Sequence, residues 1–415
     1  MKKLMGLIIS FVLFLNLQAC SQNATTPIKP LFRIRTITAG VNLSSASDLG
    51  TIKSAVAFLQ RAKTKFEAAG YEVQTLRIAT QPLPEYLGGQ TREEALVGLK
   101  KLDRLVSEKN VLLAIGPIIT DDRYDRQAAA WAGRLVKETA KVNFSITVAS
   151  PQRGIHYQSS HTAAEVIREL SRQTPGGVGN FRFTAAANCP ANIPFFPAAY
   201  HQGPENFAIG LESPPLLQAA FKNAAGMEDA KVKLKALMQS KLAAVEKLAL
   251  EIADAEQREY TGIDVSPAPG LDASIGEAIE TLTQVPFGSV STLAACAAIT
   301  DVLKGLDVKE CGYSGLMLPV LEDPILATRA AEGRYKVSDL LLYSSVCGAG
   351  LDVIPLPGDV SLRKLKVLIL DTAALSVKHH KPLSARLFPI PGKKVGDLVE
   401  FDNPFLTSSR VMGIE

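Results

Sequence analysis

Short apolar strand patterns alternate with amphipathic helical patterns along the first part of the chain, and this alternation is the strongest constraint on its fold. The strand patterns are FRIRTITAGV (32–41), VQTLRIA (73–79), VLLAIGP (111–117) and VNFSITVA (142–149). Helical patterns separate them at about 47–70, 91–108 and 123–140. Strands and helices that alternate in this way are typical of α/β proteins with parallel strands.

The second part of the chain adds more strand patterns and one long helical pattern. Strands are predicted at FRFTAAANC (181–189), NFAIGLE (206–212), TGIDV (261–265), GLMLPVL (315–321), VLILDTA (367–373), ARLFPIPG (385–392) and DLVEF (397–401). A long helical segment is predicted around 215–259 because its leucines recur at three- to five-residue intervals. We find no internal repeat and no proline-rich linker after residue 31, so residues 32–415 are predicted to form a single large α/β domain.

The first twenty residues, MKKLMGLIISFVLFLNLQAC, combine two lysines, an apolar run and a small residue before Cys20. The run is too short for an ordinary spanning helix and is typical of a secretory signal. Its last four residues, LQAC, resemble the bacterial lipobox, in which the cysteine takes a diacylglycerol group. We therefore expect residues 1–19 to be a lipoprotein signal peptide and residues 20–31 to be a tether lipidated at Cys20. The acyl chains would anchor the protein to a membrane of the bacterial cell envelope.

The charge balance gives no support for a nucleic-acid partner. The chain has 45 lysines and arginines against 41 aspartates and glutamates, a formal net charge of +4. Loss of residues 1–19 removes two lysines and leaves about +2, without any block of like charge. Four cysteines remain after Cys20, and the sequence leaves their pairing open, although a core of this size does not depend on disulfides.

Six segments together resemble the uncharacterised bacterial and archaeal family known as domain of unknown function 711, or UPF0210. They are RTITAGVNL (35–43), PFFPAAYHQG (194–203), GIDVSPAPG (262–270), CGYSGLMLPVLED (311–323), CGAGLDVIPLP (347–357) and GDLVEF (396–401). The resemblance begins at about residue 32 and is strongest after residue 180. It implies a single α/β barrel similar to the ten-stranded barrel of pyruvate formate-lyase and ribonucleotide reductase. A homodimer is a further expectation from the family, whereas no activity comes with the resemblance.

Cys311 and Cys347 are candidate reactive thiols because each is followed by glycine and because barrels of this kind place a cysteine at their centre. Glycyl radical chemistry is not expected, since RVMGI (410–414) matches the radical-bearing element poorly and an exported protein is exposed to oxygen. A cysteine nucleophile would need a nearby base, for which His201 is the first candidate. The small residues around Cys347 suit a packed turn equally well.

Three acids are the candidate catalytic residues, because functional side chains of α/β barrels follow the carboxyl ends of strands. Asp264 lies inside or just past the TGIDV strand, Glu322 follows GLMLPVL, and Asp352 lies between Gly350 and a Val-Ile pair. Two such carboxylates about 5 to 10 Å apart could serve as general acid and as base or nucleophile in hydrolysis. The alternative is structural, in which these acids cap turns or pair with a buried arginine such as Arg35.

The expected ligand-binding residues lie near the same strand ends and on the PFFPAAYHQG loop. They are Arg35, Phe195, Tyr200, His201, Glu205 and Asp323. Arg35 could meet an anionic ligand, and the aromatic rings could stack on a sugar. No zinc-type spacing and no phosphate-loop pattern is present in the sequence, so neither a metal nor a cofactor is expected.

The leading functional hypothesis is a cell-surface hydrolase for a neutral, carbohydrate-like substrate at the mouth of the barrel. The alternatives are a non-catalytic lipoprotein that binds a small molecule with the same loops and a structural subunit of an envelope complex. The sequence alone leaves the choice among these three open.

Overall fold

The apolar strands pair into one large sheet in the computed structural model, which describes residues 30–414. Its order is β8-β7-β1-β2-β3-β4-β6-β10-β9, and β5 pairs with β4. The strands are β1 (Arg33–Val41), β2 (Val73–Thr80), β3 (Val111–Pro117), β4 (Val142–Ser150), β5 (Gly154–Ile155), β6 (Phe183–Ala187), β7 (Asn206–Glu212), β8 (Glu259–Pro267), β9 (Gly350–Pro357) and β10 (Leu383–Ile390). A separate two-stranded sheet joins β11 (Leu398–Val399) to β12 (Ser409–Arg410).

Most neighbouring strands of the large sheet run parallel. Strands β1, β2, β3, β4 and β6 share one direction, whereas the pairs β7–β8 and β9–β10 run in the opposite direction. The mixed α/β architecture expected from the alternating sequence pattern is therefore confirmed for the described residues.

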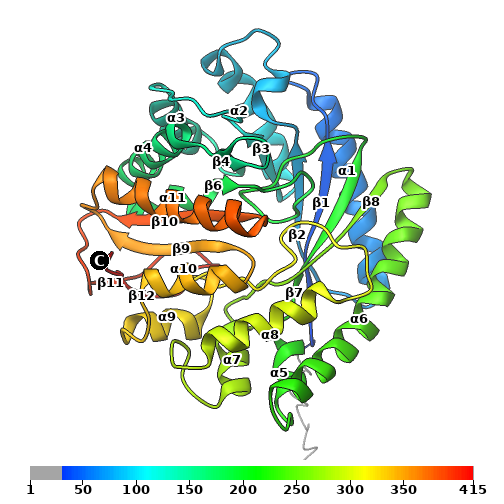
Figure 1. Ribbon diagram of the computed structural model, residues 1–415. Coiled ribbons are helices and arrows are strands. Elements are labelled where there is room, and N and C mark those ends of the chain that lie inside the picture. The colour runs from blue at the N-terminus through cyan, green and yellow to red at the C-terminus, as the bar shows by residue number, and fades with distance from the viewer. Residues whose placement is uncertain (1–29, 415) are drawn as a thin grey trace, which may run out of the picture. The chain divides into compact units, whose positions relative to one another are not determined.

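Helices surround the strands, as Figure 1 shows. They are α1 (Leu49–Ala68), α2 (Arg92–Glu108), α3 (Ala128–Glu138), α4 (Tyr157–Gln173), α5 (Pro214–Phe221), α6 (Met227–Glu256), α7 (Ile275–Thr283), α8 (Thr292–Lys304), α9 (Pro324–Ala331), α10 (Val337–Val346) and α11 (Leu362–His379), with 3-10 turns at Leu83–Tyr86 and Pro175–Arg182. Helix α1 is representative: Asp48 caps its first turn, and its buried stripe, which includes Leu59 and Phe66, packs against β1 and β2.

The sheet curves strongly, as shown by strands that are distant in its order and yet line one cavity. In a flat sheet, β1 and β10 would lie about 24 Å apart, at about 4.8 Å for each of the five steps between them. Instead, Arg35 of β1 and Arg386 of β10 both contact Glu322. Side chains of β1, β2, β3, β4, β6, β9 and β10 line the same cavity.

The segment 309–322 lies between the two edge strands of the sheet. Two hydrogen bonds join it to Ile263 of β8. The Ile263 amide donates to the Lys309 carbonyl, and the Cys311 amide donates to the Ile263 carbonyl. Towards β9, the Val320 amide donates to the Asp352 carbonyl. The strand predicted at 315–321 is not formed as regular β-structure, and Pro319 within it has no N–H for a ladder.

Two other local predictions are corrected by the structure. The strand predicted at 367–373 is wrong, because this segment belongs to helix α11, whose buried side includes Leu368 and Ile369. A short apolar run does not separate a strand from one face of a helix. The long helical segment predicted at 215–259 is divided into α5 and α6 by residues 222–226.

The predicted signal peptide, the lipobox and most of the tether lie outside the described residues. Leu31 onward forms one compact unit. No helix among the residues that the structure describes is long and apolar enough to cross a membrane.

Candidate functional site

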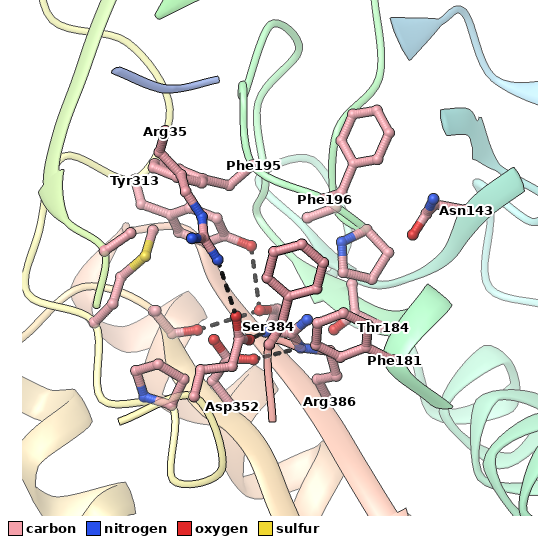
Figure 2. A pocket seen from close by; sticks show the side chains of 18 of the residues that line it. Arg35, Asn143, Phe181, Thr184, Phe195, Phe196, Tyr313, Asp352, Ser384 and Arg386 are labelled. Atoms are coloured by element: carbon pink, nitrogen blue, oxygen red, sulfur yellow. Dashed lines mark hydrogen bonds and ion pairs between the residues drawn. The ribbon is translucent and has the colours of Figure 1, made fainter. Parts of the chain in front are cut away.

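A cavity of about 100 Å³ lies on the inner side of the curved sheet, and we call it the central cavity. Figure 2 shows Arg35, Asp352 and Arg386 directed towards one another within it, with Phe195 beside Arg35 and Phe196 farther to the right. Its volume is several times the space of about 10–15 Å³ that one water molecule needs, which suits a small ligand.

Irregular strand pairing places the charged side chains in the central cavity. Arg35 is skipped in the register between β1 and β7. In the pairing of β9 with β10, Asp352 and Val353 together lie opposite the single residue Arg386. Val353 has a φ of 50°, which is a strained conformation for a β-branched residue. Such bulges redirect side chains and are frequent next to functional sites.

Four of these side chains form an ion-pair network that we call the Arg386 cluster: Arg35, Glu322, Asp352 and Arg386. Arg386 donates from Nε to Asp352 Oδ1 at 2.6 Å and from Nη2 to Glu322 Oε1. Arg35 Nη2 lies 3.6 Å from Glu322 Oε2, and Arg35 Nη1 donates to Glu212 Oε2 at 2.9 Å. Burial opposes the charge of Arg386, but Asp352 and Glu322 outweigh it and raise the pKa of this guanidinium. Both cavity carboxylates are thus already paired.

Arg77 is the exception among the three arginines of the central cavity. Its Nε donates to Thr75 Oγ1 at 3.1 Å, and its guanidinium lies 5.2 Å from the centre of the Phe196 ring. Within residues 30–414, no carboxylate oxygen is recorded within 4.0 Å of its guanidinium nitrogens. Burial lowers the pKa of Arg77 to about 9, the charge of Arg35 adds to this effect, and Glu322 opposes it. The side chain stays protonated at neutral pH, with its positive charge incompletely balanced.

Phenylalanine rings form the apolar walls of the central cavity. The guanidiniums of Arg35 and Arg386 lie over the rings of Phe405 and Phe181, at 5.4 and 4.9 Å from the ring centres. These two rings are nearly parallel, with their centres 6.4 Å apart. Each cavity arginine therefore has an aromatic face beside it, an arrangement that stabilises the cation without neutralising its charge.

Asp264, by contrast, does not line the central cavity. It is fully buried, and its carboxylate accepts hydrogen bonds from the amides of Ser266, Tyr313 and Ser314 and from the Ser266 hydroxyl. We call Asp264, Ser266, Tyr313, Ser314 and the adjoining Gly312 the Asp264 cluster. Gly312 belongs to it because a Cβ at this position, where φ is +67°, would lie 2.1 Å from Asp264 Oδ2. Burial raises the pKa of Asp264, and these hydrogen bonds oppose the shift. The expected trio of acids is therefore not assembled: Glu322 and Asp352 meet, and Asp264 is bonded elsewhere.

The other expected binding residues also divide into two groups. Arg35 and Phe195 line the central cavity. His201 is buried, and its Nε2 lies 2.9 Å from the Gly203 carbonyl oxygen, while Glu205 pairs with Arg258 at 2.7 Å. Asp323 caps helix α9 and also binds the Ser274 hydroxyl. Tyr200 lines a different pocket.

Neither candidate thiol lines the central cavity. The four cysteines in the described part of the chain are free. Burial raises the pKa of Cys347 to about 11 and raises that of Cys311 well above its usual range, so both resist forming a thiolate. Cys347 ends helix α10, and the next residue, Gly348, packs directly against Gly315. The packed-turn alternative thus describes the surroundings of Cys347.

The sequence reasoning missed Arg77 and Arg386, although both carried a readable signal. Each is the single charged residue of its strand, in VQTLRIAT (73–80) and LSARLFPI (383–390). A cation in such a position needs a polar interior. Among the described residues, no group of three or more histidine, cysteine, aspartate or glutamate side chains could hold a metal ion.

Comparison with known proteins adds relatives but no activity. A family model described as "Uncharacterised ACR (DUF711)" matches residues 29–403. The chain is 29% identical over 400 residues to a UPF0210 protein of Desulforudis audaxviator, with 89% of this chain and 88% of the relative covered. It is 26% identical over 396 residues to one from Carboxydothermus hydrogenoformans, with the same coverage, and 29% identical over 347 residues to one from Pyrobaculum aerophilum, covering 79% and 76%.

Proposed function

Because the chain belongs to the uncharacterised family DUF711, whose description names no activity, we propose from the geometry of the central cavity that the protein binds a small organic anion at Arg77. The observation that carries this proposal is the imbalance of charge. Arg386 and Arg35 already contact Glu322, Asp352 and Glu212, whereas Arg77 has only a hydroxyl and an aromatic ring as recorded partners among residues 30–414.

A buried guanidinium without a counter-ion is costly, and an anion supplies what the protein does not. Carboxylate and phosphate groups match the planar fork of arginine and bind it with two parallel hydrogen bonds. Arg35 and Arg386 reinforce the positive potential at the same place. The anionic group of the ligand is therefore expected against Arg77.

The walls of the central cavity limit the rest of the ligand. Phe181, Phe195, Phe196 and Phe405 present apolar surface, and the enclosed space is about 100 Å³. A small carboxylate with an apolar or planar body fits this combination better than a sugar polymer does. Ser384, Thr184 and Asn143 also line the cavity and offer hydroxyl and amide groups for orientation.

A hydrolase remains a second candidate, because Glu322 and Asp352 line one cavity and share Arg386. Hydrolysis by a pair of carboxylates requires one of them to be protonated and the other ionised. Both carboxylates already accept hydrogen bonds from Arg386, so neither is free to serve a substrate as acid or base, which suits ligand binding better. Glu322→Gln and Asp352→Asn variants that lose turnover of any glycoside or ester would support the hydrolase.

The binding proposal is tested by thermal denaturation of the full-length chain with matched probes. Acetate, pyruvate, succinate, benzoate and phosphate are compared with the neutral acetamide and benzamide. At least one anion should raise the melting temperature of the wild type while its amide does not. The effect should disappear in Arg77→Met and persist in Arg61→Met, which removes an arginine paired with Glu256 outside the cavity. No response to any anion, or an equal response in Arg77→Met, would overturn the proposal.

We propose further that the segment 309–322 closes the sheet into the ten-stranded barrel that the family resemblance implies. The hydrogen bonds of this segment to β8 and to Asp352 of β9 support closure. The Val320 amide donates to the Asp352 carbonyl, and the Gly348 amide donates to the Leu316 carbonyl of the segment. Slow hydrogen exchange is therefore expected at both amides, and rapid exchange at both would argue for an open sheet.

Lipidation at Cys20 and a location in the cell envelope also remain proposals, supported by the LQAC pattern. Metabolic labelling with a palmitate analogue should mark the wild-type protein in the membrane fraction. Equal labelling of the wild type and Cys20→Ala would rule out this attachment site.

A further inference from the structure

A second pocket, of about 450 Å³, opens where three neighbouring parallel strands end, and we call it the polar pocket. Pro117 ends β3, Ala149 and Ser150 end β4, and Asn188 follows β6. In α/β sheets, ligands characteristically bind beyond the carboxyl ends of parallel strands. Its volume lies in the range of about 300–1,000 Å³ that is usual for small-molecule sites.

The lining of the polar pocket differs from that of the central cavity in having no arginine or lysine. Its polar side chains are hydroxyls and amides, namely Thr120, Ser145, Thr147, Ser150, Gln152, Asn188, Tyr200 and Gln202. Burial raises the pKa of Cys189 and of Tyr200 to about 12 in each case, so both side chains are neutral at pH 7. The carboxylate of this lining, Glu85, belongs to an exposed residue. The interior of the pocket is therefore polar but uncharged.

Two lining residues have buried polar atoms without a hydrogen-bond partner. Ser145 is fully buried, and its Oγ has no partner in the structure. The Oδ1 atom of Asn188 is also buried without a partner. Asn188 has a φ of 49°. Its backbone N–H donates to the Ala149 carbonyl, and this bond fixes Asn188 beside the end of β4. Buried groups of this kind are normally satisfied, so two on neighbouring strands call for a donor from a bound molecule.

We propose that the polar pocket binds an uncharged polyhydroxylated ligand, such as a monosaccharide or polyol, through Ser145 and Asn188. Because both atoms are buried beside the pocket, each side chain turns towards the pocket on binding, where hydroxyl groups of the ligand donate to Asn188 Oδ1 and exchange a hydrogen bond with Ser145 Oγ. The proline rings at 82, 117, 151 and 190 and the ring of Tyr200 supply apolar surface for the C–H faces of the ligand. Charged molecules of the same shape are excluded, because the interior offers no counter-ion.

The polar pocket is a site separate from the central cavity. The two share Ala198 alone among their lining residues, and Phe196 and Pro197 face the central cavity side of this segment. Binding of a neutral ligand in the polar pocket does not depend on Arg77, so the two proposals can fail independently.

The test is saturation-transfer NMR and calorimetry on the full-length chain. The probes are glucose, galactose, N-acetylglucosamine, myo-inositol and glycerol, with gluconate and glucosamine as charged analogues. At least one neutral probe should bind saturably, and the charged analogues should not. Ser145→Ala and Asn188→Gly should each weaken binding about tenfold or more, because each removes a buried hydrogen bond to the ligand.

Both variants are expected to fold. Ser145→Ala removes a hydroxyl that has no partner in the structure, and glycine tolerates the positive φ of Asn188. Arg61→Met, at a residue that lines neither the central cavity nor the polar pocket, is the matched control and should bind the neutral probe as the wild type does. The proposal is overturned if no neutral probe binds, if the charged analogues bind as well as the neutral ones, or if binding survives both pocket substitutions in variants whose melting temperature is unchanged.

Discussion

The Asp264 cluster and the Arg386 cluster both bury carboxylates on segments that carry the family resemblance, yet they differ in what those carboxylates bond. Asp264 accepts hydrogen bonds from the amides of Ser266, Tyr313 and Ser314 and from the Ser266 hydroxyl, and it does not line the central cavity. Glu322 and Asp352 bond a side chain, Arg386, and line the central cavity. A carboxylate that accepts its hydrogen bonds mainly from backbone amides stabilises the fold. Carboxylates that are held by an arginine side chain lie here beside open space. Four substitutions test this difference.

The largest effect is expected at Asp264. Asp264→Ala leaves four buried donors without an acceptor and should lower the free energy of unfolding by about 3–5 kcal/mol. Urea unfolding measures the loss, with Asp301→Ala, at an exposed aspartate, as the control. A loss below about 1 kcal/mol, the usual size for a surface position, would contradict the structural role of Asp264.

Arg386→Met should be nearly as damaging, because it leaves Asp352 without its recorded cation and leaves Glu322 with Arg35 alone, at 3.6 Å. Breaking a buried pair from one side costs about 3–5 kcal/mol. Adding Glu322→Gln and Asp352→Asn to Arg386→Met should restore much of the stability. If the triple variant is less stable than Arg386→Met alone, charge repulsion is not the source of the loss.

Arg77→Met should change the free energy of unfolding less than Arg386→Met does, and it should not lower it. Removing an arginine whose charge has no counter-ion should leave the stability unchanged or raise it by about 1 kcal/mol in buffer without ligand. Chemical denaturation of Arg77→Met and Arg386→Met side by side gives the comparison directly. A loss from Arg77→Met as large as that from Arg386→Met would mean that Arg77 is paired within the fold and not reserved for a ligand.

The smallest effect concerns Asp48, a less buried counterpart of Asp264. Burial would raise the pKa of Asp48, but hydrogen bonds from Ser44 and Thr51 outweigh it and lower the pKa to about 2. A depressed folded pKa adds stability above the unfolded value of about 3.9, and this is lost as the pH falls towards 2. Asp48→Ala should cost about 1 kcal/mol at pH 7 and less at pH 2.5. A cost independent of pH would show that the carboxylate charge is not involved.

Much of the fold follows from the sequence, because periodicity is local. The strands at 73–80, 111–117 and 142–150 lie where their apolar patterns predict them. The failures come from context: the 367–373 run is apolar enough for a strand, but its neighbours continue the helical stripe of α11. Likewise, Pro319 interrupts the ladder in a segment that otherwise reads as a strand.

The candidate site was harder to predict, because it depends on contacts between residues far apart in sequence. Arg35, Glu322 and Asp352 were identified as ligand or catalytic residues, and they do meet. The common partner of Glu322 and Asp352 is Arg386, which lies 64 residues from Glu322, and no local pattern links the two. In the sequence Asp264 and Asp352 are alike, since each lies in or beside an apolar strand pattern that contains glycine. Only the position of the 313–314 amides distinguishes them.

The bulge at Val353 has a consequence for the length of the chain. Since Asp352 and Val353 together face Arg386, and Ile354 is already opposite Leu387, β9 can lose Val353 and keep every later residue on its present side of the sheet. The loss removes one buried side chain and one unfavourable φ. At any regular position of the same strand, a one-residue deletion would move every downstream side chain to the opposite face of the sheet. Position 353 is thus where β9 can be shortened by one residue while the residues after it keep their pairing with β10.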